Sequence, residues 1–170
     1  MNYFKKSIQS GLEEYYQTLK SVLTDLNNTE LFWRPNLQSN NIIFLVWHMG
    51  LVEDNLINKI LCKKNRIWIT DKYYERFPSL KNETGFGFTL EELDNFPQMD
   101  IAWLMNYFEA VRKKTEHKIE KISQMDLASN YNFSNSKVSG YWVLGRLITE
   151  ESQHLGQISY IRGLVRGLNK

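Results

Sequence analysis

The sequence has little cysteine, little proline and no long apolar run. Its single cysteine, Cys62, excludes an internal disulfide framework, and no Cys-x-x-Cys pair is present to hold zinc or exchange thiols. No apolar segment approaches the length that spans a bilayer, and the first residues are followed by polar ones instead of the apolar stretch of a signal peptide. We therefore expect a soluble, cytoplasmic protein without membrane contact.

A block of positive charge is also missing. Lysine and arginine number 21 against 19 aspartates and glutamates, and the basic residues are scattered among the acidic ones. This distribution argues against a nucleic-acid partner, because such proteins carry a basic patch. A chain of 170 residues has the size of one domain with a substantial core, so we expect residues 1–170 to form a single domain.

Four segments carry apolar residues at steps of three and four, the spacing of an amphipathic helix. These segments are residues 3–26, 41–61, 100–125 and 138–168. No strand pattern is visible between them. The sequence therefore predicts an all-α fold, a four-helix bundle with short connections in the first and last helix pairs and a long crossover connection between helices 2 and 3.

The connections carry turn and capping residues. Asn27-Asn28-Thr29 should end the first helix, and one of Ser39, Asn40 and Asn41 should cap the second. Residues 126–139, rich in asparagine and serine, are predicted to form a loop.

The crossover, residues 63–97, is rich in aromatic residues and lacks a helical period. We expect short helices near 71–77 and 89–95, the latter opened by a Thr89-x-x-Glu92 capping box. The aromatic residues favour a lid over one end of the bundle more than a surface for stacking bases, because basic residues are not interleaved with them.

The last predicted helix places two polar side chains within its apolar stripe. Glu150 and His154 lie one turn apart among Val143, Leu147 and Ile158. Burying this pair costs free energy unless something pairs with it. A divalent metal would do so, and the alternative is a direct hydrogen bond between Glu150 and His154 at a wet end of the bundle.

A third candidate ligand lies on the second helix. His48 falls at the border of that helix's apolar face, where an isolated histidine is usually a satisfied edge residue. Together, however, His48, Glu150 and His154 would supply three ligands from facing helices. Three protein ligands leave coordination positions open, as in catalytic or substrate-binding sites.

Several other polar residues lie near these three candidate ligands in the sequence. Glu151 competes with Glu150 as the acidic ligand, because a spacing of three residues also places it on the same side of the helix as His154. Glu53 and Asp54 are expected to support the site or face solvent. Gln157 is expected to orient a ligand or a bound water, and His117, set among charged residues, to face solvent.

An ordered series of motifs extends over nearly the whole chain. The motifs are Trp33-Arg34-Pro35, Asn41-Ile42, Leu45-Val46-Trp47-His48-Met49, Glu53-Asp54, Tyr74-Glu75-Arg76-Phe77, Thr84-Gly85-Phe86-Gly87-Phe88-Thr89-Leu90-Glu91-Glu92 and Glu150-Glu151-Ser152-Gln153-His154-Leu155-Gly156-Gln157 with the residues up to Leu164. Together they resemble the DinB-like family of metal-binding four-helix bundles, and in particular a subgroup with a Glu-Arg-Phe and a Thr-Gly-Phe-Gly segment.

The resemblance implies a bundle with a crossover, a divalent metal that is zinc or nickel in relatives, and often a homodimer. Family members with known activity include thiol transferases that use bacillithiol, glutathione or mycothiol, and a mycothiol-dependent maleylpyruvate isomerase. Common members carry a third histidine where this chain has Glu150, whereas the subgroup is acidic there. The resemblance thus implies His48, Glu150 and His154 as metal ligands, although such ligands also suit manganese.

Two functions follow as expectations. The first is a divalent-metal-dependent enzyme acting on a thiol or another small molecule, as a thiol-dependent S-transferase or a hydrolase. The alternative is a non-catalytic, stress-related bundle protein whose metal is structural or sensory.

Overall fold

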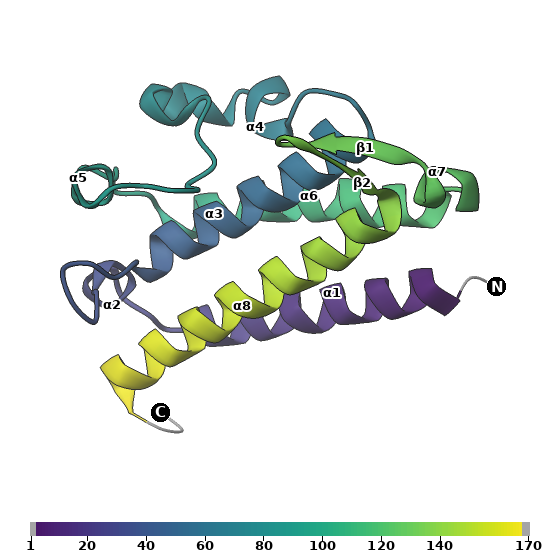
Figure 1. Cartoon of the computed structure of the whole chain (residues 1–170). Coiled ribbons are helices and arrows are strands. Elements are labelled where there is room, and N and C mark those ends of the chain that lie inside the picture. Colours follow the sequence, from purple (N-terminus) through teal and green to yellow (C-terminus); the bar gives the residue numbers. More distant parts are fainter. Residues whose placement is uncertain (1–2, 168–170) are drawn as a thin grey trace.

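Four long helices form the frame of the computed structural model, which describes residues 3–167 (Figure 1). The central helix α3 packs against both α6 and α8, and α1 packs against α8. This arrangement confirms the all-α fold and the long crossover between the second and third long helices. The four helices are α1 (Tyr3–Leu23), α3 (Ile42–Asp54), α6 (Ile101–Lys121) and α8 (Gly140–Arg166).

Helix α3 is buried almost throughout, and only Val52 is partly exposed. Its N-terminus is capped by Asn41, whose side-chain oxygen accepts a hydrogen bond of 2.8 Å from the backbone N–H of Phe44. At its C-terminal end the chain continues without a break into a π-helix, Asn55–Leu61. Such wide turns are rare and often occur at functional sites, and this one extends the helix face that carries His48.

The connection between α1 and α3 contains a short helix that the sequence interpretation missed. Asn27 caps α2 (Asn28–Phe32), because its side chain accepts from the N–H of Glu30 while the Glu30 carboxylate accepts from the N–H of Asn27. The prediction that Asn27-Asn28-Thr29 only ends the first helix was therefore wrong. These residues begin a new helix after a break at residues 24–27.

The crossover is built from short helical pieces. The expected helix near 89–95 is confirmed as α5, with the Thr89 and Glu92 capping box in place. The expected helix near 71–77 is only a 3-10 turn, and α4 was not predicted. The pieces are α4 (Ile67–Thr70), two 3-10 turns (Tyr73–Arg76 and Pro78–Leu80) and α5 (Leu90–Asp94).

The aromatic residues of the crossover pack along the side of the bundle and do not form the expected lid over its end. Tyr73 and Phe77 contact Trp103 of α6, with ring centroids 5.7 and 5.3 Å apart. Phe88 packs against Phe44 and Trp47 of α3 in the same way. The crossover thereby adds its rings to the hydrophobic core.

The connection between α6 and α8 was predicted as a loop, and this prediction was wrong. It contains α7 (Gln124–Ala128) and an antiparallel hairpin of β1 (Asn130–Phe133) and β2 (Ser136–Ser139). Ser123 caps α7 in a reciprocal hydrogen-bond pair with Asp126. The hairpin contacts the π-helix and the start of α8, so neither connection within the first or last helix pair is a plain short loop.

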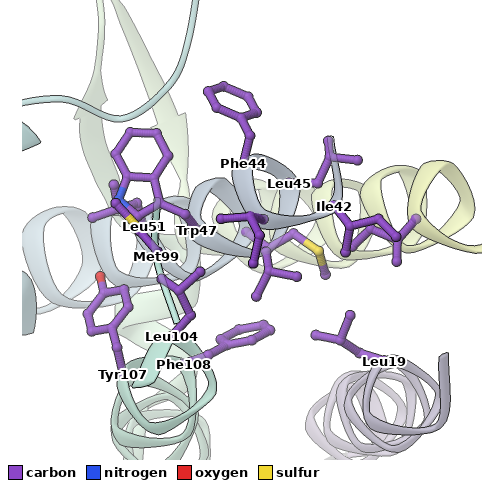
Figure 2. Packing of buried hydrophobic residues seen from close by; sticks show 14 of the residues in the cluster. Leu19, Ile42, Phe44, Leu45, Trp47, Leu51, Met99, Leu104, Tyr107 and Phe108 are labelled. Atoms are coloured by element: carbon purple, nitrogen blue, oxygen red, sulfur yellow. The ribbon is translucent and has the colours of Figure 1, made fainter. Parts of the chain in front are cut away.

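The main core lies between α3 and its neighbours. Figure 2 shows Leu104, Tyr107 and Phe108 of α6 and Leu19 of α1 facing α3 from two sides. Helix α8 begins at Gly140, capped by Ser139, and the predicted end at Leu168 lies outside the described residues. Among residues 3–167, no helix has the length and apolar character needed to cross a membrane.

Candidate metal centre

The side chains of His48, Glu150 and His154 meet between α3 and α8. Their ligand atoms all lie within 4.8 Å of one another. One oxygen of Glu150 is 3.1 Å from Nε2 of His154 and 4.0 Å from Nε2 of His48. The two imidazole rings are nearly perpendicular, with centroids 4.8 Å apart. The structure therefore brings together the three residues that the sequence selected.

His48 is held by the crossover. Its Nδ1 lies 2.5 Å from the carbonyl oxygen of Thr84, and a carbonyl only accepts hydrogen bonds, so Nδ1 must carry the proton. This leaves the lone pair on Nε2, which faces Glu150. Burial lowers the pKa of His48 to about 4, so its ring is neutral near pH 7. This tautomer, fixed by a backbone carbonyl, is the form in which histidine binds metals.

His154 is held by Gln157, the residue one turn further along α8. Nδ1 of His154 lies 3.0 Å from the side-chain oxygen of Gln157, so a proton on Nδ1 again leaves Nε2 with its lone pair. Burial lowers the pKa of His154 as well. The expectation that Gln157 orients a ligand therefore agrees with its position.

The three groups then present acceptors to one another. Two neutral imidazole nitrogens and a carboxylate oxygen converge with no proton between them, and a cation balances such a set. A direct hydrogen bond between Glu150 and His154 is possible at 3.1 Å if the other tautomer forms. That bond does not account for His48, whose Nε2 is too far from Glu150 for a hydrogen bond. The donor set fits a divalent metal ion.

Glu150 is also tied to a cation on its own helix. Its second oxygen forms an ion pair with the guanidinium of Arg146, one turn earlier in α8. Arg146 was not singled out from the sequence, although its spacing of four residues from Glu150 was the available signal. The carboxylate therefore has one oxygen held by Arg146 and the other aimed at the histidines.

Glu151, the competing ligand, points the other way. Its carboxylate is buried beside Arg112, which donates to it at 3.1 Å and to Glu53 at 2.8 Å. Burial raises the pKa of Glu151 to about 8, and the nearby charge of Glu53 adds to this rise while Arg112 opposes it. Glu151 therefore belongs to a buried hydrogen-bonded network with Glu53 and Arg112 and not to the metal cluster.

Glu53 and Asp54 were expected to support the site or to face solvent, and because both are fully buried the second alternative was wrong. Asp54 accepts hydrogen bonds from the backbone N–H groups of Ile67 and Trp68, each at 3.0 Å. It also accepts from Tyr107 at 2.8 Å. Asp54 thus ties the end of α3 to the start of the crossover.

A pocket of about 710 Å³ opens beside the cluster. Its walls come from α3, the π-helix, the hairpin, α8 and the crossover, and Phe86 of the crossover stands at its edge with 89% of its surface exposed. The lining residues are His48, Val52, Asn55, Leu56, Lys59, Ile60, Thr84, Phe86, Asn132, Phe133, Ser134, Trp142, Arg146, Glu150, Gln153 and His154. A volume of this size accommodates a small organic molecule.

Besides Arg146, two residues that shape the centre were missed from the sequence. Arg112 continues the helical spacing of Phe108 and Thr115, which was a signal that it faces inward. The carbonyl of Thr84 gave no signal, because every residue has one and only the path of the crossover brings this one to His48. His117 lies exposed on α6, as expected.

Comparison with known proteins identifies the family. No curated protein matches the chain. A crystal structure described as a conserved protein of locus from Enterococcus faecalis superposes with a TM-score of 0.84 over 95% of this chain and 96% of that one, at 22% sequence identity, and so shares its fold. The model of the DinB superfamily matches residues 12–158, which include all three residues of the cluster. The chain therefore belongs to the DinB superfamily.

Proposed function

We propose that the protein is a divalent-metal-dependent enzyme that acts on a small molecule bound in the pocket beside His48, Glu150 and His154. The observation that supports this most directly is the convergence of their ligand atoms within 4.8 Å at the wall of a pocket of about 710 Å³. A purely structural metal is usually enclosed by four protein ligands. Here three ligands adjoin an open volume that a substrate can enter.

His48, Glu150 and His154 would hold the ion, zinc or nickel in relatives. The ion would supply Lewis acidity to a thiol or a water molecule brought into the pocket. The protein's own groups prepare this site. Thr84 fixes the ring of His48, Gln157 that of His154, and Arg146 holds the Glu150 carboxylate in place.

A thiol-dependent S-transferase is the form of this enzyme that we favour. Hydrolysis by water usually needs a general base near the attacking oxygen. Glu150 is the only carboxylate among the residues that line the pocket, and it is already assigned as a ligand. Glu151 is turned into the core against Arg112. A thiol needs less help because it ionises more readily than water.

Metal analysis tests the first half of the proposal. Protein purified without a nickel column should carry about one divalent ion per chain. His48→Ala, Glu150→Gln and His154→Ala should each lose it, by more than the roughly 10–100-fold in affinity that loss of a supporting residue costs. Two matched controls should keep it: Glu151→Gln, the adjacent acid, and His117→Ala, the exposed histidine on α6. Equal metal content in all variants would contradict the assignment.

An activity assay tests the second half. Metal-loaded protein should accelerate conjugation of bacillithiol to monochlorobimane, and His48→Ala and His154→Ala should abolish the acceleration. If no turnover occurs and chelation instead causes a large fall in melting temperature, the metal is structural. That result would favour the non-catalytic bundle protein over the enzyme.

The same proposal includes two remaining expectations, the homodimer from the family resemblance and the cytoplasmic location from the sequence. We expect two chains to pair as a homodimer, which light scattering coupled to gel filtration measures directly. We also expect the protein in the cytoplasm, where low-molecular-weight thiols are abundant, and cell fractionation tests this.

A further inference from the structure

The pocket beside the metal cluster carries an excess of positive charge even before an ion binds. Two cationic side chains, Lys59 and Arg146, line it, against the single carboxylate of Glu150. Arg146 is paired with Glu150. The Lys59 side chain is exposed and has no ion-pair or hydrogen-bond partner within residues 3–167. A lysine that lines a pocket and lacks a partner favours an anionic ligand.

One side of α3 and the π-helix carries both groups. His48, Val52, Leu56 and Lys59 all line the pocket, so the lysine faces the same space as the histidine. The two residues are eleven positions apart, so the α-helical rise sets an upper limit of about 16 Å between their backbone positions, and the wider π-helix shortens it. The flexible lysine side chain shortens the distance that a ligand must span.

Another part of the pocket wall is aromatic. Trp142, the first of the pocket residues on α8, packs against Phe133 of the hairpin with ring centroids 4.9 Å apart. Trp142 remains 40% exposed, so part of its ring is available to a ligand. Exposed aromatic surface lining a pocket binds flat apolar groups well.

We propose that the pocket binds an amphiphilic anion: a molecule with a flat apolar body that lies against Trp142 and Phe133, and an anionic group that pairs with Lys59. Its other end reaches the cluster of His48, Glu150 and His154. Such a molecule would be the substrate class of the proposed enzyme. Only the reaction of the end that reaches the cluster rests on the proposed function. Carboxylate, sulfonate and phosphate share the chemistry that Lys59 recognises.

Two fluorescent probes with the same aromatic rings distinguish the contribution of the anionic group to binding from that of the rings. 1-Anilinonaphthalene-8-sulfonate carries the anion, and N-phenyl-1-naphthylamine is the same molecule without it. The wild-type protein, treated with a chelator, should bind both probes, and the anionic one more tightly. Lys59→Gln should weaken binding of the anionic probe about three- to tenfold and change binding of the neutral probe less than twofold. Trp142→Ala should weaken both.

Lys64→Gln is the matched control, because Lys64 is also exposed and lies just beyond the π-helix but does not line the pocket. It should bind both probes like the wild type. Circular dichroism and melting curves check that each variant is folded. The inference is wrong if the wild type binds neither probe. It is also wrong if Lys59→Gln changes the affinity for both probes equally or for neither, or if Lys64→Gln weakens binding of the anionic probe as much as Lys59→Gln does.

Metal content measured on the same variants separates this inference from the proposed function. Lys59→Gln should retain its ion. If Lys59→Gln weakens binding of the anionic probe but the protein never binds metal, the anion site is supported and the metal-dependent function is wrong. If metal binds as proposed but Lys59→Gln does not change probe binding, the metal centre is supported and the anion site is wrong.

Discussion

Gly85 lies where the crossover comes closest to the metal cluster, next to the carbonyl of Thr84 that fixes His48. Its φ is +79°, a conformation that side-chain-bearing residues rarely adopt. A Cβ at this position would lie 2.8 Å from Nδ1 of His48 and 2.8 Å from the ring of Trp47. Only glycine therefore lets the backbone approach the histidine closely enough for the Thr84 carbonyl to accept a hydrogen bond from its Nδ1–H group.

The effect of an alanine at position 85 on stability can be compared with that of an alanine at the neighbouring Gly87. Gly87 also has a positive φ, +74°, but nothing lies within 4 Å of the position its Cβ would take. We expect Gly87→Ala to lower the free energy of unfolding by about 1 kcal/mol, from backbone strain alone. Gly85→Ala should cost about 2–3 kcal/mol, because it adds the clash, and should weaken metal binding at least tenfold.

Urea unfolding and a metal titration of both glycine variants check this expectation. Equal losses in the two variants would show that the close approach to His48 contributes nothing.

The sequence was sufficient to select His48, Glu150 and His154 but not to choose between Glu150 and Glu151. Both acids share a helix side with His154, so the choice depends on how α8 is turned relative to α3 and α6. The structure makes that choice through Arg112, which is buried beside Glu151. A sequence alone usually places an arginine on the surface.

Asp54 connects two elements that belong to different parts of the chain. It accepts from the first free N–H groups of α4, at Ile67 and Trp68, and from the side chain of Asn58 in the π-helix at 2.8 Å. These N–H groups lie at the start of a helix and have no partner within it. Asp54 therefore anchors the beginning of the crossover to the end of α3.

Removing this carboxylate should release the crossover. We expect Asp54→Ala to lower the free energy of unfolding by about 3 kcal/mol, because several buried donors lose their acceptor at once. Hydrogen exchange should speed up at the amides of Ile67 and Trp68. Asp71→Ala, which removes an exposed acid at the end of α4, should change stability by less than about 0.5 kcal/mol. Unchanged exchange at Ile67 and Trp68 would argue against the anchor.

The elements that the sequence missed are short and stabilised by contacts outside themselves. The four long helices were found because their apolar periodicity extends over many turns. The hairpin at residues 130–139 has only four residues in each strand, with Tyr131 the single buried side chain of β1. Its pairing depends on the π-helix and α8 beneath it, which a local pattern does not reveal.

At the scale of the whole molecule, α8 closes the bundle by binding the end of α1. Arg162 donates to the carbonyls of Val22 and Thr24 at 2.8 and 3.0 Å, where the last carbonyls of a helix lack partners. Arg166 pairs with Glu30 of α2 at 2.7 Å. The end of the last helix thus holds the connection between α1 and α3 in place.

The pair between Arg166 and Glu30 should make stability depend on pH in acid. The hydrogen bond from Arg166 lowers the pKa of Glu30 from 4.5 to about 2. A lowered pKa means that the contribution is complete above pH 4.5 and is lost as the pH falls toward 2. The difference in melting temperature between wild type and Glu30→Gln should therefore be largest at neutral pH and should vanish near pH 2.

Glu91→Gln, at an exposed acid of α5, serves as the control for this series and should show no such trend. A constant difference between wild type and Glu30→Gln across the whole pH range would exclude the ion pair as its cause.

The different directions of Glu150 and Glu151 limit how α8 can be rebuilt. Neighbouring residues of an α-helix project about 100° apart, so the two carboxylates fix the roll of the helix about its own axis. One residue inserted between Ser139 and Glu150 would shift the phase of everything after it by that angle. Thr149 would then take the position that faces the histidines, and the carboxylate of Glu150 would move to the position that faces Arg112. Variation in length should therefore be tolerated in the hairpin but not in the first three turns of α8.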